Sequence, residues 1–157
     1  MMTPGELANI LKRAARKAKT ELVAPTRELM TELSEMSKEY IGHYQEGWAP
    51  LADTTLNGWD SPWGIHYPGK IELGYAPPDN PLLRTGAMKE SIGEQAEATG
   101  SGAIGVVGSN SPIALWQEMG TSKGIPPRPF LGLTMMRSEP IASVTFGEFA
   151  VKILLGD

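Results

Sequence analysis

The chain contains no cysteine and only two histidines among its 157 residues. Without cysteine it can form no disulfide and offers no thiolate to a metal ion, so nothing indicates secretion into an oxidising compartment. The two histidines, His43 and His66, stand apart from any close cluster of further ligands, and a zinc site is therefore not indicated. Glycine-rich phosphate loops, nucleophile elbows and dinucleotide fingerprints are also absent. The sequence thus predicts a protein without enzymatic activity, metal or cofactor.

Long apolar runs are lacking as well. The N-terminus has no apolar core of signal-peptide length, and no window has the length needed to cross a bilayer, so we expect a soluble protein made inside the cell. The length fits one domain, residues 1–157, with a core large enough to fold alone. Within it we distinguish a helical region at 1–46, an extended loop or arm at 47–81, and an α+β core with a C-terminal segment at 82–157.

The charge is unevenly distributed. A formal net charge of -4 and a pI near 5.2 argue against nucleic-acid binding by the whole surface. A short basic stretch nevertheless comes first, and glutamates follow it; its members are Lys12, Arg13, Arg16, Lys17 and Lys19. Three interpretations stay open: two solvated helix faces, a charged contact between neighbouring subunits, or basic residues placed beside DNA.

The first 46 residues have helical periodicity. Thr3 can cap a helix that has Pro4 in its first turn, and apolar residues then recur at helical spacing as far as Leu22. Pro25 interrupts this pattern because it lacks an amide hydrogen and its ring crowds the preceding turn. The stripe resumes and runs to a stop at Gly47, through Leu29, Leu33, Met36, Tyr40 and Tyr44. We predict two helices, or one helix kinked at Pro25.

The segment 47–81 is rich in proline and glycine and shows no periodicity. Disordered linkers are poor in aromatic residues, whereas this segment holds Trp48, Trp59, Trp63, Tyr67 and Tyr75. These side chains should be buried against something. The segment is either an irregular loop folded over its own domain or an arm that becomes ordered on a neighbouring subunit, since aromatic anchors are typical of interfaces.

Residues 82–120 predict short elements. Thr85 can cap a short helix, and Gly86 punctuates it. Two short runs, 94–98 and 103–107, flank a flexible turn and favour a β-hairpin. Ser111 and Pro112 then fit the cap and first position of a helix that Gly120 ends.

The remaining residues begin with a proline-rich segment at 124–131, which is too stiff for a central strand and belongs at an edge or in a loop. Residues 133–138 suggest a helix, and Pro140 should interrupt it. Residues 141–155 then fit a helix better than a strand.

Four stretches, in this order and at this separation, resemble one known family. They are Trp48-Ala49-Pro50-Leu51 with Thr54-Thr55-Leu56; Pro81-Leu82-Leu83-Arg84-Thr85-Gly86-Ala87-Met88 with Ser91 and Ile92; Val107-Gly108-Ser109 with Ala114 and Gln117-Glu118-Met119-Gly120-Thr121; and Ile125-Pro126-Pro127-Arg128-Pro129-Phe130-Leu131-Gly132. The family is that of small neck and tail-completion proteins of tailed bacteriophages, also called virion-morphogenesis or minor tail proteins. The resemblance covers roughly residues 48–132, and the ordered set is more specific than any one stretch.

The resemblance implies an α+β fold in which long N-terminal helices pack on a small, mostly antiparallel sheet. It also implies a homo-oligomeric ring of six subunits, a place in the virion neck or tail, and residence in the host bacterial cytoplasm before assembly. The implied partners are a tail tube or tail terminator protein, head–tail connector or adaptor proteins, and packaged DNA in passing. No membrane and no cofactor are implied.

Candidate interface residues follow from side-chain chemistry and from these stretches. Arg84 and Arg128 suit bidentate pairing with a carboxylate, for which Glu118 is the candidate, within or between subunits; solvated arginines are the alternative. A rigid proline frame precedes two apolar residues that either enter a neighbouring pocket or fill their own core. The full set is Trp48, Leu51, Trp59, Trp63, Arg84, Glu118, Arg128, Phe130 and Leu131.

Two other functions remain open at this point. A small hydrolase would need a cleft in which His43 or His66 meets a glutamate. A DNA-associated module would use the basic N-terminal helix, through Lys12, Arg13, Arg16, Lys17 and Lys19.

Overall fold

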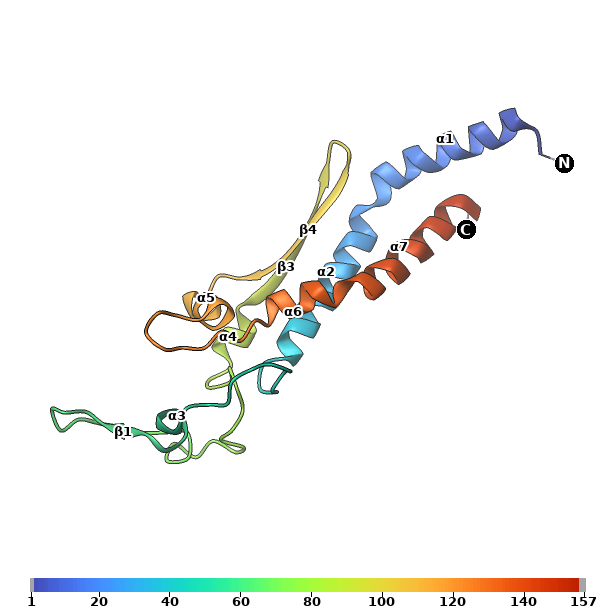
Figure 1. Cartoon of the computed structure of the whole chain (residues 1–157). Coiled ribbons are helices and arrows are strands. Elements are labelled where there is room, and N and C mark those ends of the chain that lie inside the picture. Colours follow the sequence, from blue (N-terminus) through green and yellow to red (C-terminus); the bar gives the residue numbers. More distant parts are fainter. Residues whose placement is uncertain (1, 156–157) are drawn as a thin grey trace.

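Three long helices and one long β-hairpin dominate the computed structural model, which describes residues 2–155 (Figure 1). The helices are α1 (Pro4–Glu21), α2 (Val23–Glu39) and α7 (Ser138–Leu155), and the hairpin consists of β3 (Ile92–Thr99) and β4 (Gly102–Ser109). Helix α2 packs on the antiparallel β3–β4 sheet, and α7 lies along α1 and α2. The predicted α+β class is therefore confirmed. Residues 1, 156 and 157, which the predicted domain includes, lie outside the described part.

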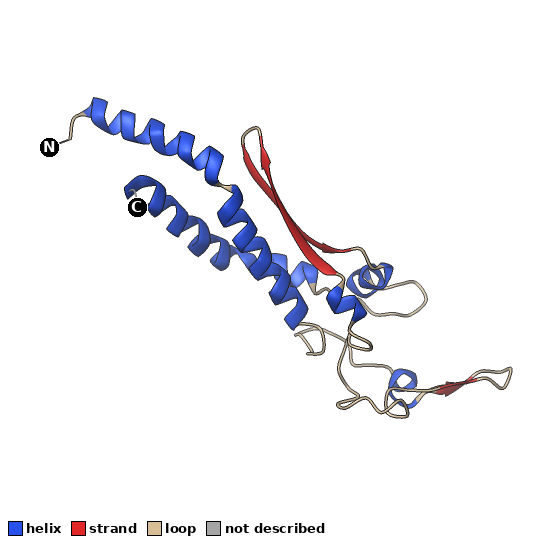
Figure 2. Ribbon diagram, turned by 180° about the vertical axis from the view of Figure 1, so that it is seen from behind, coloured by secondary structure: helices blue, strands red, loops and turns tan. Residues whose placement is uncertain are grey.

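Shorter elements complete the chain at one end of these helices. Figure 2 shows the long hairpin on one side of α2, and most of the short elements lie beyond the C-terminal end of α2, whereas α6 packs beside that helix. In chain order they are α3 (Asp53–Asn57), β1 (Trp59–Asp60), β2 (His66–Tyr67), α4 (Ala87–Glu90), α5 (Pro112–Met119) and α6 (Leu131–Met136).

The chain begins with the predicted cap. The Thr3 hydroxyl accepts a hydrogen bond from the Glu6 amide (3.2 Å), and the Glu6 carboxylate accepts one from the Thr3 amide (2.7 Å). This reciprocal pair satisfies two amide groups that no helical carbonyl can reach. Helix α1 ends at Glu21, and Pro25 lies in the first turn of α2, where a missing amide hydrogen removes no helical bond. The prediction of two helices is confirmed.

The end of the second helix was predicted wrongly. Helix α2 ends at Glu39, well before Gly47, because Tyr40 and Ile41 turn into the core instead of continuing the stripe. Tyr44 falls on the helical repeat in the sequence, yet it lies in the irregular segment beyond the helix. Spacing alone could not show this, since the same apolar residues suit either conformation.

The hairpin is longer than the two runs that predict it. Ala96 lies opposite Gly105 and Glu94 opposite Val107, on the face that packs on α2. A side chain at Gly105 would bring its Cβ within 2.5 Å of the Met30 Cγ, so glycine allows α2 to approach the sheet closely. The opposite face leaves Ile104 and Val106 exposed.

The C-terminal helices also depart from the prediction. Helix α6 starts at Leu131, two residues before the predicted start at residue 133. Pro140 does not interrupt a helix, because it lies in the first turn of α7. The first amides of a helix have no acceptor within it, so proline is tolerated there. The helix predicted for residues 141–155 is confirmed. Among residues 2–155, no helix combines the length and the apolar character needed to cross a membrane.

The irregular segment 47–81 contains three elements that the sequence did not predict, namely α3, β1 and β2. Both strands have two residues, which is too short for any periodicity to be visible. In Figures 1 and 2 this segment projects from one end of the chain, and the N-terminal half of α1 projects from the other.

The core sits where the end of α2 meets α4, α5 and the start of α6. Its buried members are Tyr40, Ile41, Trp48, Met88, Ile92, Ala114 and Phe130. The buried hydroxyls of Ser37 and Thr134 share a hydrogen bond (2.8 Å) that joins α2 to α6. The core therefore joins three of the four stretches on which the family resemblance rests, and the side chain of Trp48 brings in the fourth.

Candidate assembly interface

Arg128 ties the proline-rich segment to the base of the irregular segment. Its side chain is buried, and its guanidinium donates to the Ala49 carbonyl (3.2 and 2.9 Å) and to the Pro50 carbonyl (3.0 Å). Burial lowers the pKa of Arg128, although a guanidinium stays charged at neutral pH. The Arg128 amide also donates to the Gln117 carbonyl at the end of α5 (2.6 Å). One residue thus joins three segments that are distant in sequence.

Glu118 caps helix α6 from outside that helix. Its carboxylate accepts hydrogen bonds from the amides of Phe130 (2.9 Å), Leu131 (3.0 Å) and Gly132 (2.7 Å). A carboxylate at a helix N-terminus satisfies unpaired amides and opposes the positive end of the helix dipole. A Cβ on Gly132 would lie 3.0 Å from the Glu118 Oε1, so this residue must be small.

The predicted pairing of an arginine with Glu118 is wrong within the chain. Arg128 binds backbone carbonyls and Glu118 binds backbone amides, so each charge is matched by peptide dipoles instead. Arg84 is exposed beside α4 and reaches neither of them in any described contact. A backbone carbonyl or amide partner cannot be identified from the sequence, whereas side chains of opposite charge can be, and this led to the predicted pairing.

Three of the predicted interface residues fill the chain's own core. Phe130 is fully buried at 0% exposure, Trp48 is buried, and Leu131 packs against them. We call these residues, with Ala49, Pro50, Glu118 and Arg128, the motif junction. Gly120 closes α5 beside it at φ 71°, a conformation that glycine adopts without strain. The junction holds the body of the chain together.

Residues 51–79, which we call the arm, leave the body and return to it at one tyrosine. The Tyr44 hydroxyl donates to the Asp79 carboxylate (2.6 Å) and accepts from the Leu51 amide (2.9 Å). Burial raises the pKa of Tyr44, and the hydrogen bond to Asp79 raises it further. Leu51, predicted as an interface residue, is half-buried at this point where the arm begins.

The arm presents aromatic side chains to solvent. Strands β1 and β2 pair in register, and the Trp59 and Tyr67 rings stack with their centroids 5.0 Å apart and their planes 10° apart. Trp63 at the tip of this hairpin is 82% exposed. Other exposed apolar side chains of the arm are Ile65, Ile71 and Leu73. Of the predicted interface residues, Trp59 and Trp63 are therefore available to a partner, as is the exposed Arg84.

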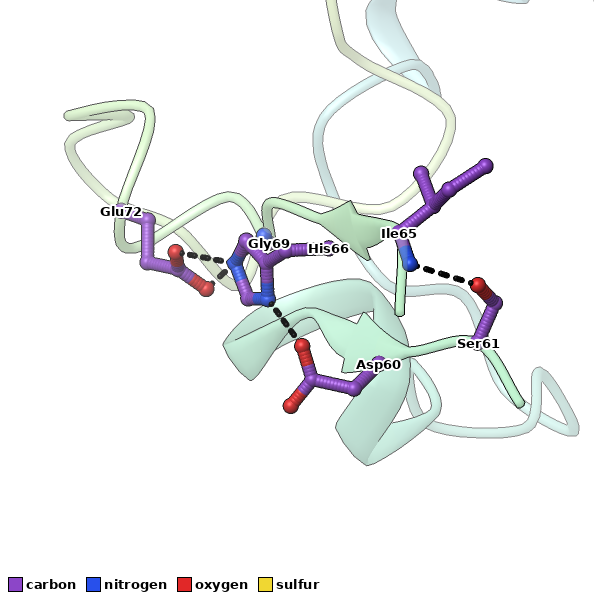
Figure 3. A network of polar contacts seen from close by, with 6 residues as sticks. All are labelled: Asp60, Ser61, Ile65, His66, Gly69 and Glu72. Carbon is purple, nitrogen blue, oxygen red and sulfur yellow. Dashed lines mark hydrogen bonds and ion pairs between the residues drawn. The ribbon is translucent and has the colours of Figure 1, made fainter. Parts of the chain in front are cut away.

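His66 clamps the arm between two carboxylates (Figure 3). Its Nδ1 lies 2.8 Å from Asp60 Oδ1, and its Nε2 lies 2.7 Å from Glu72 Oε2. The hydrogen bond to Glu72, followed by the one to Asp60, raises the pKa of His66. The same contact with His66, followed by the Gly69 amide, lowers the pKa of Glu72. A protonated imidazole donates from both nitrogens and so holds β1, β2 and the following turn together.

Close backbone packing supports the clamp. A Cβ on Gly69 would lie 2.2 Å from the Gly58 nitrogen, so both positions accept only glycine. The Lys70 amide donates to the Thr55 carbonyl (2.9 Å), and the buried Lys70 ammonium donates to Asn80 at the arm's exit. Burial lowers the pKa of Lys70. The arm therefore carries its own internal scaffold.

The basic stretch lies on α1, far from the arm. Four of its five members are exposed, and none forms an ion pair within the described residues; they are Lys12, Arg13, Arg16, Lys17 and Lys19. Leu7 and Leu11 on the same helix are about half exposed, at 48% and 50%. Helix α1 buries only Ala14, so most of its surface is free to meet a partner.

The acidic and histidine side chains are dispersed within residues 2–155. No three acidic, histidine or cysteine side chains are grouped to hold an ion there. The two nitrogens of His66 point to opposite sides, so Asp60 and Glu72 do not face one shared position. His66 has an exposed side chain (49%) and lies outside the surface hollows on α1 and between α2 and α7.

Several functional residues were missed by sequence reasoning. Tyr44 was assigned to a helix stripe, and Asp60, Glu72, Lys70 and Asp79 were not singled out. The sequence signal was the spacing of acidic residues six positions either side of His66, which suits clamping of a short hairpin. Without a predicted hairpin, that spacing has no evident meaning.

The four stretches of the family resemblance meet in one place. Trp48 to Pro50, the 81–92 stretch, Glu118 and Arg128 to Gly132 surround the core and are joined by the contacts described above. Residues that the resemblance singles out therefore mostly build the body, and the arm supplies the exposed aromatic surface. In a comparison with known proteins, no family model, curated protein or solved structure matches the chain.

Proposed function

We propose that the chain is a non-enzymatic structural subunit of a tailed-bacteriophage virion, which joins or completes the tail at the head–tail neck as one copy of a ring. The ordered stretches within residues 48–132 support the family, as a resemblance. The physical support is the apolar surface that a single chain exposes to solvent.

The amount of exposed apolar surface is the observation that carries the proposal. The chain exposes 10445 Å², whereas a compact monomer of 16.9 kDa exposes about 7,700 Å². Among residues 2–155, twenty-two large apolar side chains are exposed and only ten apolar side chains are buried. The excess of roughly 2,700 Å² lies in the range that obligate subunit interfaces bury. A self-assembling subunit accounts for this surface.

A ring accounts for its distribution. Rings of identical subunits form through a heterologous contact, in which one face meets a different face of the next copy. The exposed apolar side chains of this chain lie on separate regions, including the arm, α5 and α7. On the family resemblance the ring has six subunits and contacts a tail tube or terminator protein on one side and connector or adaptor proteins on the other.

The test is the mass of the purified chain in solution, measured by light scattering over a concentration series. A discrete ring supports the proposal, as does a monomer that becomes a ring when tail-tube or connector protein is added. A chain that stays monomeric with each of these proteins overturns it.

A DNA-associated module is the second candidate, because α1 carries five cations without ion-pair partners in the described chain. Phosphate contacts make binding fall steeply with salt. Salt-sensitive binding of duplex DNA that disappears when Lys12, Arg13, Arg16, Lys17 and Lys19 are changed to glutamine would favour this function over the first.

A further inference from the structure

The arm and α1 carry opposite charge. The arm has four carboxylates, and its one lysine, Lys70, is buried against Asn80; the carboxylates are Asp53, Asp60, Glu72 and Asp79. Helix α1 has five cations and two glutamates, of which Glu6 is occupied in the N-terminal cap. Even with His66 protonated, the arm is acidic and α1 is basic. Opposite potentials of this kind steer two surfaces together.

Both surfaces also expose apolar groups. The arm presents Trp63 at its tip, and α1 with the residues just before it presents Met2, Leu7 and Leu11 at about half exposure or more. An open hollow on α1 is lined by Met2, Glu6, Asn9, Ile10 and Arg13. An indole in that hollow would contact the apolar side chains, and the Arg13 guanidinium could lie over its ring as a cation–π pair.

One chain cannot bring these surfaces together. The arm and the N-terminal half of α1 project from opposite ends in both views (Figures 1 and 2). The helices between them are packed on the hairpin, so the ends stay apart. Any contact of the arm with α1 is therefore a contact between copies.

We propose that the arm of one copy docks on α1 of the next copy, with Trp63 at the centre of the contact. This inference rests on the proposed ring and names its two complementary faces. When each copy places its arm on one neighbour and receives the arm of another on its α1, the contact is heterologous, as a ring requires.

The arm is built in a way that suits docking. Its stacked rings, the His66 clamp and the Gly58–Gly69 packing fix its shape before any partner arrives. A preformed surface loses less conformational entropy on binding than a flexible one. Tryptophan is also among the residues that contribute most to protein interfaces. A rigid acidic support with an exposed indole is therefore an effective anchor for a basic helix.

DNA is a weaker occupant of α1. Phosphates would use its cations but leave Leu7 and Leu11 uncovered, and the net charge of -4 opposes the approach of DNA. The arm offers carboxylates to the cations of α1 and apolar groups to its apolar side chains, and every copy of the chain has an arm.

Cysteine cross-linking tests the contact directly, because the chain has no cysteine of its own. Ile65→Cys chains, which keep Trp63, and Asn9→Cys chains, both altered at exposed positions, are mixed under assembling conditions and treated with a short bismaleimide. We expect a covalent heterodimer in high yield. The matched control replaces Asn9→Cys by Met119→Cys, a 72% exposed position on α5 that the proposal leaves outside the contact.

The outcomes separate this inference from the proposed function. A ring by light scattering without the 65-to-9 link, or with equal linking to position 119, overturns the docking and leaves the ring standing. A chain that never assembles overturns both. If the cross-link does not form and duplex DNA binds α1 instead, the cations of α1 serve nucleic-acid binding and the docking is overturned.

Charge reversal gives a second, independent measurement. Lys12→Glu with Arg16→Glu should weaken self-association at least tenfold at low salt, because both changes place like charges opposite the arm. The matched control is Lys89→Glu with Lys123→Glu, which changes the net charge equally at exposed positions outside α1. Equal weakening by the two pairs would attribute the effect to net charge alone and contradict the docking.

Discussion

The motif junction and the arm place their aromatic and charged side chains in opposite ways. The junction buries Trp48 and Phe130 and satisfies Glu118 and Arg128 with backbone groups. The polar side chains of the arm form hydrogen bonds within the arm, and Trp63 is exposed to solvent. The comparison shows that the aromatic residues of segment 47–81 have different roles: buried rings stabilise the chain, and exposed rings are available to partners.

The largest effect should come from the junction's buried ring. Phe130→Ala removes a side chain with 0% exposure and leaves a cavity in the core, so the free energy of unfolding should fall by about 3–5 kcal/mol. Urea unfolding followed by circular dichroism measures it. A loss under about 1 kcal/mol would mean that the junction is not the centre of stability, and the comparison would fail.

The next effect tests the helix cap from the junction. Glu118→Ala leaves three amides at the start of α6 without an acceptor and should destabilise the chain by about 2 kcal/mol. Glu118→Gln keeps one acceptor oxygen and should lose about half as much. Unfolding midpoints of the two variants give the ranking. Equal stability of both variants and the parent would show that solvent replaces the carboxylate.

The arm should respond in the reverse sense. Trp63→Ala changes an exposed side chain, so the free energy of unfolding should stay within about 0.5 kcal/mol of the parent. Self-association should nevertheless weaken by at least tenfold, as light scattering at matched concentrations would show. If stability falls while association is unchanged, Trp63 serves the chain itself and the distinction between the two regions disappears.

The smallest effect concerns pH. The pKa of His66 is raised, so its stabilisation is complete below the ordinary histidine value, about 6.5, and is lost as pH rises through the folded-state pKa. The pKa of Glu72 is lowered, so its stabilisation is complete above the ordinary value for glutamate and is lost as pH falls through the folded-state pKa. The clamp should therefore be strongest in mildly acidic solution.

Amide hydrogen exchange of β1 and β2 measures this clamp locally. At pH 6, corrected for intrinsic rates, the parent should be better protected than His66→Gln, and the gap should narrow at pH 8. Because all three side chains are exposed, the global unfolding midpoint should hardly move. Equal protection of the two proteins at pH 6 would mean that the clamp contributes nothing to the arm's order.

The sequence predicted what periodicity and local chemistry determine. Thr3 and Pro4 marked the first helix, alternation marked the β3–β4 hairpin, and Gly120 marked the end of α5. These features depend on residues within a few positions of one another, which a sequence displays directly.

Contacts between distant residues were not predictable. Arg128 was expected to seek a carboxylate and instead binds the Ala49 and Pro50 carbonyls, 79 and 78 positions away. Tyr44 fits the helical repeat in the sequence but lies beyond the end of α2, where its hydroxyl forms hydrogen bonds with Leu51 and Asp79. Backbone groups are the same at every position, so a sequence cannot show which of them a side chain will choose.

The hydroxyl of Tyr44, which receives both ends of the arm, makes residues 51–79 an exchangeable insert. Where a loop leaves and returns at neighbouring points, its length and content can change with little effect on closure of the chain, because the entropy of closure grows slowly with length. The body can therefore be kept while the insert is replaced. On the proposed function, mutations confined to this one loop would direct the chain to a different neighbour without repacking a single core residue.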